Sequence, residues 1–321
     1  MVVDKPYDAV LWAEAAHLRR EFWGNRIFLR GIIEFSNHCR QNCLYCGLRR
    51  DNAALPRYRL DTDALLACAV RIKRLGIGTV VLQSGEDDAL DANEMARIVE
   101  AVKAMGLAVT LSLGERDAAS FRLWREAGAD RYLLKFETGN PARYARLRPG
   151  RTLEARLDAL RCLQDAGYET GSGMILGLPE ETEADMIHDL ALLTTLQPDM
   201  VSVSPFVPHP ATPLAGCPAC PDRRILDGMA RTRIALPRAH MPVTSALSLR
   251  GEAMRLLALQ VGNVIMPSLT PENVREAYMI YPGKNRQPTA PEERAAAMRD
   301  SLLAAGFELP EGPGSAWRLS Q

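Results

Sequence analysis

Short apolar runs alternate with helical patterns along most of this 321-residue chain, and this alternation limits the fold more than any other feature. Such alternation implies parallel strands joined by helical crossovers. Eight units fit an α/β fold of one complete (β/α)8 TIM-type barrel, which commonly needs about 250 residues. An open doubly wound sheet is the alternative, and no GxGxxG turn supports it. The predicted strands cover 27–36, 79–84, 108–113, 131–137, 169–177, 200–206, 242–246 and 263–267, and the helices between them lie near 61–75, 91–105, 116–127, 151–167, 181–196, 222–236 and 250–259.

Two smaller segments flank the predicted barrel, which spans residues 27–284. Residues 1–26 are expected to form an N-terminal helical extension, with an amphipathic helix over 6–24. Residues 285–321 are expected to form a C-terminal helix, near 291–305, and a loosely structured tail.

Side-chain alternation in the first strand places Arg30, Glu34 and Ser36 on one face. In a barrel that face points inward. Because barrel chemistry gathers at the carboxyl ends of strands, we expect Arg30 to form a buried ion pair at the barrel floor.

Charge and apolar runs restrict the classes of partner. Lys plus Arg equals Asp plus Glu at 39 each, so no basic excess points to nucleic acid. No apolar run reaches the length of a membrane span, and the N-terminus lacks the pattern of a signal peptide. A cytoplasmic location is therefore expected. There, seven cysteines are metal ligands, catalytic groups or buried thiols more often than disulfides.

Three cysteines follow the first strand in the sequence CRQNCLYC: Cys39, Cys43 and Cys46. A [4Fe–4S] cluster normally takes four cysteines, so three local ligands leave one iron open. A zinc site completed by His38, or chance spacing, is the alternative, but zinc prefers paired ligand spacing and His38 directly adjoins Cys39.

This CxxxCxxC loop resembles that of the radical S-adenosylmethionine (SAM) superfamily. The resemblance implies one [4Fe–4S] cluster whose open iron binds SAM, and reductive cleavage of SAM to a 5′-deoxyadenosyl radical. It also implies that Tyr45 packs near the adenine.

Further stretches at predicted strand ends resemble the SAM-binding elements of the superfamily. Ser84, Gly85 and Glu86 resemble the Gly-Gly-Glu element that holds the SAM ammonium group, with Ser in the first position. Glu137 sits where a carboxylate can bond the ribose; the alternative is a loop acid. Gly173 and Ile175 lie in a GxIxG pattern that resembles the adenine-side element.

Arg156 falls on the apolar side of its predicted helix, where a cation needs an anionic partner. The SAM carboxylate suits a guanidinium, and a structural ion pair is the alternative.

Several longer stretches resemble the HydE family of radical SAM maturases, which is related to biotin synthase and methylornithine synthase. They are FLRGIIEFSNHCRQNCLYCGLRRDN (28–52), TVVLQSGED (79–87), VTLSLGE (109–115), AGADRYLLKFETGNP (127–141), GYETGSGMILGLP (167–179), PFVPHPATPL (205–214), NVIMPSLTP (263–271) and YPGK (281–284).

The HydE resemblance implies a function and a substrate. The family helps to build the dithiomethylamine-bridged di-iron subcluster of [FeFe]-hydrogenase from an iron–cysteine complex that carries CO and cyanide. It implies that Ser112 lies beside SAM and that Gln83, Thr110, Thr244 and Ser245 line the substrate side. A reductant protein of flavodoxin or ferredoxin type would supply the electron.

Some positions depart from the family pattern. Lys135, Phe136 and Gly139 stand in KFETGNP where the family often reads RHETANP, and SVSPF (202–206) replaces GIGPF. Ser245 stands where the family usually has Thr. These changes leave open a HydE-like enzyme of small-molecule metabolism, of biotin-synthase or methylornithine-synthase type. A non-catalytic iron–sulfur carrier is a third hypothesis, although a carrier needs no SAM-binding elements.

The other cysteines are expected to have modest roles. Cys68 and Cys162 lie in helical patterns and are predicted to be core thiols. Cys217 and Cys220 form a CxxC in a Pro-rich loop, for which an incidental role is favoured and a redox pair stays open. No cysteine follows Cys220, so the accessory cluster of many HydE proteins is not expected.

Overall fold

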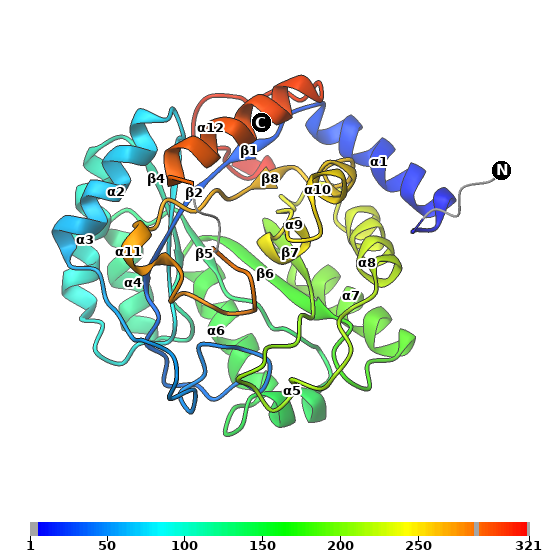
Figure 1. The fold of residues 1–321 in the computed structure, drawn as a ribbon, viewed down its shortest axis with the longest axis horizontal. Helices are drawn as coiled ribbons and strands as arrows, with labels where there is room; N and C mark the ends of the chain where they lie inside the picture. Colours follow the sequence, from blue (N-terminus) through cyan, green and yellow to red (C-terminus); the bar gives the residue numbers. More distant parts are fainter. Residues whose placement is uncertain (1–5, 286–288, 320–321) are drawn as a thin grey trace.

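A computed structural model describes residues 6–285 and 289–319, and its centre is a parallel sheet of six strands. The strands follow the order β2-β3-β4-β5-β6-β7, so each neighbours the next along the chain. Helices surround the strands in Figure 1, as crossovers between parallel strands require. The predicted α/β fold is confirmed. The strands are β1 Phe28–Leu29, β2 Gly31–Ser36, β3 Thr79–Ser84, β4 Ala108–Ser112, β5 Arg131–Leu133, β6 Glu169–Leu176, β7 Met200–Pro205 and β8 Val264–Ile265.

Short pairings continue the ladder from β7 towards β1. β1 pairs in parallel with β8, and single parallel bridges join Met200 to His240 and Pro242 to Val264. The predicted strand over 242–246 is wrong. Pro242 has no N–H to donate to a ladder, and helix α9 already begins at Ser245.

The crossover helices begin where a short polar side chain caps the first turn. In α2, α3, α4, α6 and α7 an Asp or Thr oxygen accepts a backbone N–H of that turn. The helices are α1 Ala9–Trp23, α2 Thr62–Arg74, α3 Ala92–Ala104, α4 Ala118–Glu126, α5 Pro141–Leu147, α6 Leu153–Asp165, α7 Glu183–Leu196, α8 Asp222–Ala235, α9 Ser245–Ser248, α10 Glu252–Ala258, α11 Glu272–Arg275, α12 Pro291–Ala304 and the 3-10 helix η1 Trp317–Leu319. Within the described residues, no helix is long and apolar enough to cross a membrane.

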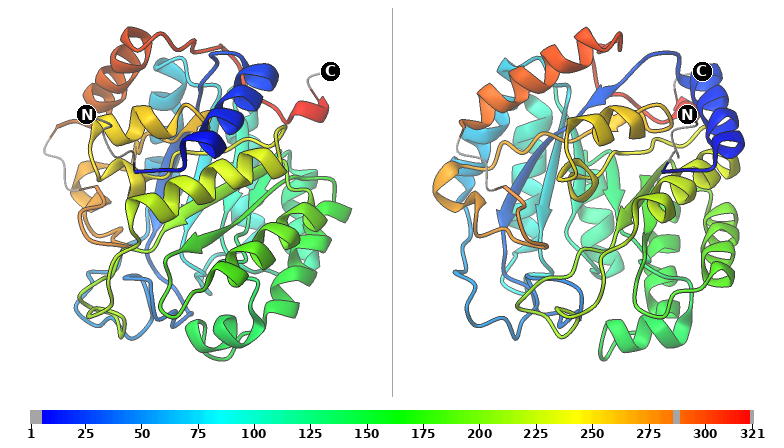
Figure 2. Two further views of the ribbon diagram at one scale, coloured as in Figure 1. Left: turned by 90° about the vertical axis from the view of Figure 1, so that its right-hand side faces the viewer. Right: turned by 45° about the vertical axis from the view of Figure 1, so that its right-hand side comes forward.

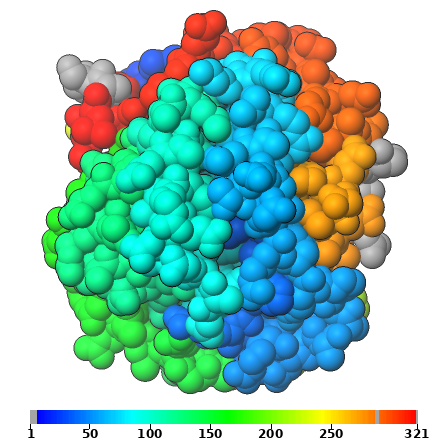
Figure 3. All heavy atoms as spheres, turned by 90° about the vertical axis from the view of Figure 1, so that its left-hand side faces the viewer, coloured from blue at the N-terminus to red at the C-terminus, as the bar shows by residue number. Residues whose placement is uncertain are grey.

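The outward faces of the strands pack on these helices and form the core. Val80 and Leu82 of β3 are fully buried in the same apolar cluster as Ile72 of α2 and Val99 of α3. Figure 3 shows how closely α2 and α3, in blue and cyan, cover this side of the molecule. The core therefore lies between the strands and their helices. Its packing holds the strands in place, and with them the loops that follow their carboxyl ends.

The two ends of the chain pack against the barrel. Helix α1 lies on α8, and α12 runs past the opposite side of β1 (Figures 1 and 2). The segment 313–316 lies under the amino ends of the strands, where Pro313 O accepts from Thr79 Oγ1 at 2.8 Å and Ala316 N donates to Glu169 at 2.8 Å. The tail is thus tied to the barrel floor rather than loose.

The floor of the barrel corrects one prediction about Arg30. Its side chain points inward and is buried, but it forms no ion pair within the described residues. It donates instead to Gly314 O at 3.1 Å and to Met200 Sδ at 3.2 Å. The carboxylate at the floor, Glu169, pairs with Arg131 at 2.9 Å, because the two residues lie opposite each other on β5 and β6.

Candidate active site

A cavity of about 850 Å³ opens at the carboxyl ends of the strands. The loops that follow the strands of a barrel meet at this end. Most of the predicted site residues, which come from separate strands and loops, share this one cavity. Those that line it are Cys39, Cys43, Tyr45, Cys46, Gln83, Ser84, Gly85, Glu86, Ser112, Glu137, Arg156, Ile175, Thr244 and Ser245.

Thr110 and Gly173 are the predicted site residues that do not line this cavity. Thr110 is fully buried in β4, two residues before Ser112. At Gly173 a Cβ atom would lie 2.0 Å from the Ser202 carbonyl oxygen. Glycine is therefore required there by the close approach of β6 and β7, and a strand pattern alone does not separate this cause from ligand binding.

The three cysteines project from the cysteine loop, which we define as residues 37–58. Asn37 and Tyr58 close its neck, because Asn37 N donates to Tyr58 O at 3.3 Å and Tyr58 N donates to Asn37 Oδ1 at 2.8 Å. The loop also contacts its neighbours through backbone bonds: Gly47 N donates to Ile280 O at 3.0 Å and Leu44 N to Leu147 O at 2.9 Å. A closed and anchored loop holds the thiols at the cavity wall.

The thiols of the loop are poorly suited to ionise by themselves. Burial raises the pKa of Cys39, Cys43 and Cys46, and repulsion from a neighbouring thiolate raises that of Cys39 and Cys46 further. Bound iron supplies the positive charge that thiolate ligands need. The donor set therefore fits an iron–sulfur cluster.

The three thiols of the loop do not form a site for a single metal ion. Within residues 6–285 and 289–319, no three His, Cys, Asp or Glu side chains are grouped so that they could hold a single metal ion. A four-iron cube spreads its thiolate ligands over different irons. The three thiols line one cavity, where a cluster held by all three would lie.

Charged side chains behind the cysteine loop surround Glu86. Its carboxylate accepts from Gln41 Nε2 at 2.5 Å and from Arg148 Nη2 at 3.1 Å. Burial would raise the pKa of Glu86, but Arg148 and Arg156 outweigh burial and lower it. The Glu86 carboxylate is thus ionised and held by guanidinium groups in this structure.

Arg156 forms a structural ion pair, which the sequence left open as the alternative to a contact with the SAM carboxylate. Its Nε lies 2.6 Å from Glu115 Oε1, and Tyr144 Oη accepts from the same nitrogen at 3.1 Å. Its Nη2 is buried and lies 3.6 Å from Glu86 Oε1, but it makes no hydrogen bond with any described residue. The guanidinium is therefore held between Glu115 and Glu86, and its Nη2 can still donate a hydrogen bond at the cavity.

Glu137 has an unusual backbone conformation at the end of β5. Its φ of 67° lies in the left-handed region, which side chains other than Gly rarely adopt and which clusters at functional sites. Its carboxylate lies 3.3 Å from Lys135 Nζ, which donates to Ser204 Oγ at 3.1 Å. The paired oxygen, Glu137 Oε2, is buried and accepts no hydrogen bond from the described residues.

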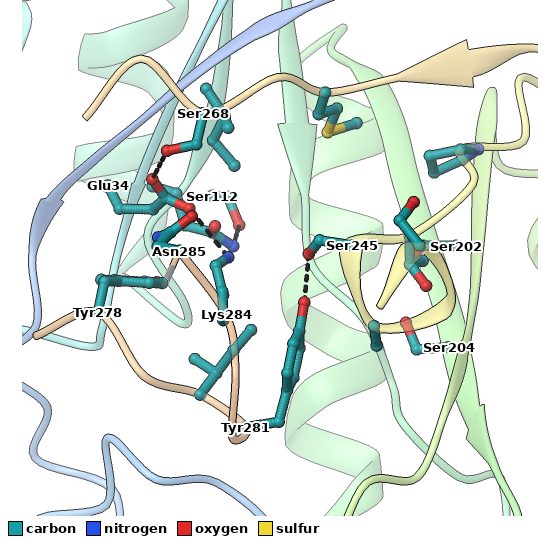
Figure 4. A pocket seen from close by; sticks show the side chains of 18 of the residues that line it. Glu34, Ser112, Ser202, Ser204, Ser245, Ser268, Tyr278, Tyr281, Lys284 and Asn285 are labelled. Carbon is teal, nitrogen blue, oxygen red and sulfur yellow. Dashed lines mark hydrogen bonds and ion pairs between the residues drawn. The ribbon is translucent and has the colours of Figure 1, made fainter. Parts of the chain in front are cut away.

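Two polar contacts at the cavity wall were not predicted, and Figure 4 shows both. Lys284 lies 2.9 Å from Glu34 Oε1, and Ser268 Oγ donates to the same carboxylate at 2.6 Å. On the other side, Ser245 bonds Tyr281. The position of Glu34 on the inward face of β2 indicated that this side chain is buried. Its partner, Lys284, lies 250 residues away along the chain, and no local sequence pattern identifies Lys284.

The remaining cysteines follow the predictions in part. Cys68 and Cys220 are buried, whereas Cys162 is exposed, which corrects its assignment to the core. In α6 the buried stripe includes Leu160 and Leu163, and Cys162 lies about 100° from Leu163 around the helix.

Comparisons with known proteins agree with this geometry. Residues 33–193 match the model of the radical SAM superfamily. The [FeFe] hydrogenase maturase subunit HydE of Thermotoga maritima is 45% identical over 282 residues, which are 88% of this chain and 81% of that protein. The 3-methylornithine synthase of Methanosarcina barkeri is 30% identical over 84% of this chain and 77% of its own length.

A solved structure shows the same fold. The crystal structure of methylornithine synthase (PylB) has a TM-score of 0.81 and 26% identity, and the match covers 94% of this chain and 89% of that chain. The superfamily uses a [4Fe–4S] cluster with three cysteine ligands and SAM, and the cavity presents three cysteines on one loop. The chain therefore belongs to the radical SAM superfamily of enzymes and, within it, to the HydE family.

Proposed function

We propose that this chain is a HydE-type radical SAM maturase whose Cys39, Cys43 and Cys46 hold the [4Fe–4S] cluster. The observation that carries the proposal is the single cavity lined by these three thiols and by polar side chains at the ends of four strands. When bound, the cluster supplies one electron for the reductive cleavage of SAM.

The groups around the cysteine loop are assigned to the parts of SAM. Ser84 ends β3, Gly85 and Glu86 follow it, and the segment lies beside Cys39, since a Cβ on Gly85 would stand 2.7 Å from Cys39 Cβ. They would orient the ammonium group. Arg156 Nη2 and Glu137 Oε2 make no hydrogen bond to a described residue, although Glu86 and Lys135 lie beside them. Arg156 Nη2 would bond the carboxylate, and Glu137 Oε2 would accept from the ribose. Tyr45, Ser112 and Ile175 line the same cavity and would enclose the adenosine.

The rest of the cavity is assigned to the substrate. Gln83 Oε1 and Thr244 Oγ1 are buried and lack hydrogen-bond partners among the described residues. With Ser245 they would bind an iron–cysteine complex, and the product would enter the di-iron subcluster of [FeFe]-hydrogenase. The 45% identity to HydE supports this substrate over one of biotin-synthase or methylornithine-synthase type.

A small acidic reductant, of flavodoxin or ferredoxin type, would deliver the electron at the cysteine loop. The segment 37–60 carries five arginines and one aspartate, although the whole chain has no net charge. Arg50, Arg59 and Arg146 expose about half or more of their side chains at this surface. Opposite charge on the partner would speed its docking. All seven cysteines are free thiols, which suits the cytosol as the location.

Two assays test the proposal. Anaerobically reconstituted protein, given dithionite and SAM, is expected to yield 5′-deoxyadenosine; a fully loaded protein that yields none would refute radical SAM chemistry. In a hydrogenase maturation mixture that lacks its own HydE, the chain is expected to restore hydrogen production. Cleavage of SAM without restored maturation would assign the enzyme to another substrate.

A further inference from the structure

The Arg57 side chain occupies the interior of the cysteine loop. Its guanidinium donates to Asn37 O at 2.6 Å, Leu48 O at 2.9 Å and Arg49 O at 2.8 Å. Asn52 O accepts a longer bond, at 3.5 Å. These carbonyls belong to the stretches just before Cys39 and just after Cys46. The planar fork of the guanidinium is therefore fixed by the backbone that carries the cysteines.

The charge of Arg57 is not neutralised by a carboxylate. No Asp or Glu of the described residues lies within 4.0 Å of its nitrogens. The contrast with its neighbours is clear, because Arg59 lies 2.5 Å from Asp87 and Arg148 lies 3.1 Å from Glu86. A half-buried cation that bonds neutral carbonyls alone keeps its full positive charge.

Two cysteines each lie two residues from a carbonyl that Arg57 binds, because Asn37 precedes Cys39 and Leu48 follows Cys46. Burial lowers the pKa of Arg57, whereas the thiolates of Cys39 and Cys46 raise it. Because Arg57 is fixed on the backbone that carries both cysteines, its positive charge favours negative charge on their sulfur atoms. Arg148 plays the corresponding part at Cys43, but Glu86 offsets it.

We propose that Arg57 is the cation that offsets the negative charge of a cluster held by Cys39, Cys43 and Cys46 and so favours its one-electron reduced form. The proposal rests on the proposed function. Three thiolates and a [4Fe–4S]²⁺ core carry a net charge of −1, and one electron from the reductant makes it −2. A fixed positive charge stabilises the second state more and raises the reduction potential.

The test is a redox titration of anaerobically reconstituted protein, without SAM, in which electron paramagnetic resonance reports the reduced cluster. Arg57→Gln removes the charge and keeps two N–H donors, and Arg57→Lys keeps the charge. Arg50→Gln is the matched control, because Arg50 is exposed, belongs to the same loop and pairs with Asp51. Iron content and thermal unfolding of each variant accompany the titration.

For Arg57→Gln we expect the ratio of reduced to oxidised cluster, at a fixed solution potential, to fall about tenfold, a shift of 59 mV for a one-electron couple. Arg57→Lys should recover more than half of that shift, and Arg50→Gln should stay within about twofold of the parent.

Three outcomes would overturn the proposal: an unchanged potential in Arg57→Gln, an equal shift in Arg50→Gln, or loss of iron from both Arg57 variants. The last would show that the carbonyl contacts, and not the charge, are what the loop needs. A parent protein that binds no cluster would instead refute the proposed function.

Discussion

The two ends of the barrel treat buried charge differently. At the amino end, the Arg131–Glu169 pair is sealed by the C-terminal residues 313–316, and a space of about 10 Å³ remains, which is room for about one water. At the carboxyl end, a cavity of about 850 Å³ is bordered by Gln83 and Thr244, whose buried Oε1 and Oγ1 atoms lack a hydrogen-bond partner within the described residues. Buried polar atoms without a partner are costly, and a ligand in the cavity can satisfy those at the carboxyl end, whereas the buried Nε of Arg30 at the amino end has no hydrogen-bond partner within the described residues.

The largest expected effect comes from a variant that removes a cluster ligand at the carboxyl end. Cys43→Ala removes one of three cluster ligands and should lower the rate of 5′-deoxyadenosine formation at least about a thousandfold, or about 4 kcal/mol in the activation barrier. Iron content and the visible spectrum should change with it. Cys162→Ala is the control, because that thiol is exposed on α6. An unchanged cluster spectrum in Cys43→Ala would contradict the ligand assignment.

The next largest effect comes from a variant that disrupts the ion pair at the amino end and leaves the cavity unchanged. Arg131→Met leaves the Glu169 carboxylate buried without its ion-pair partner, so we expect the free energy of unfolding to fall by about 3–5 kcal/mol in urea denaturation. Arg318→Met at the same end removes an exposed partner of Asp199 and should cost about 1 kcal/mol or less. Equal losses in the two variants would show that the floor is not sealed as described.

A third prediction concerns the loop that carries Glu137. Asp189 accepts from Gly139 N at 2.5 Å, and burial raises the pKa of Asp189 to about 7, which repulsion from Glu181 and Asp185 also favours. An acid whose pKa is raised by folding favours the folded state below its unfolded pKa, near 4, and this contribution is lost as the pH rises to about 7.

Asp189→Asn should therefore be more stable than the parent at pH 8, by up to about 4 kcal/mol, and should match it near pH 4. Thermal unfolding at several pH values measures the difference. Asp158→Asn, at an exposed position of α6, serves as the control. A pH-independent difference for Asp189→Asn would exclude this titration as the cause.

The smallest expected effect sharpens the assignment of Glu137. Glu137→Gln keeps one acceptor and removes the charge, so KM for SAM should rise about tenfold, or about 1.4 kcal/mol, with a smaller change in kcat. Glu180→Gln is a matched control, because Glu180 also has a positive φ, of 62°, but pairs with Arg146 at the surface. A change in kcat alone would argue against a ribose contact.

Much of the fold and of the site could be predicted because each signal is local. Strand and helix periodicity gave the parallel order of β2 to β7, and cysteine spacing identified the loop that lines the cavity. The prediction of a strand over 242–246 was wrong, because a short apolar run does not show that Pro242 and α9 interrupt the ladder. Gly173 does not line the cavity and is packed on Ser202, and a glycine in a strand sequence indicates close packing and ligand approach equally well.

The sequence by itself determined the chemistry: three cysteines on one loop, and polar side chains at the ends of successive strands. The tertiary structure decided the partners of the charged groups. Lys284 pairs with Glu34 across 250 residues, and the C-terminal segment covers the floor. Near the cysteines, Arg40, Arg49, Arg50 and Arg59 pair with carboxylates, whereas Arg57 has no carboxylate within 4.0 Å among the described residues. The physical reason is that two charges attract over a few ångströms in space. The number of residues between them along the chain does not indicate whether they are that close.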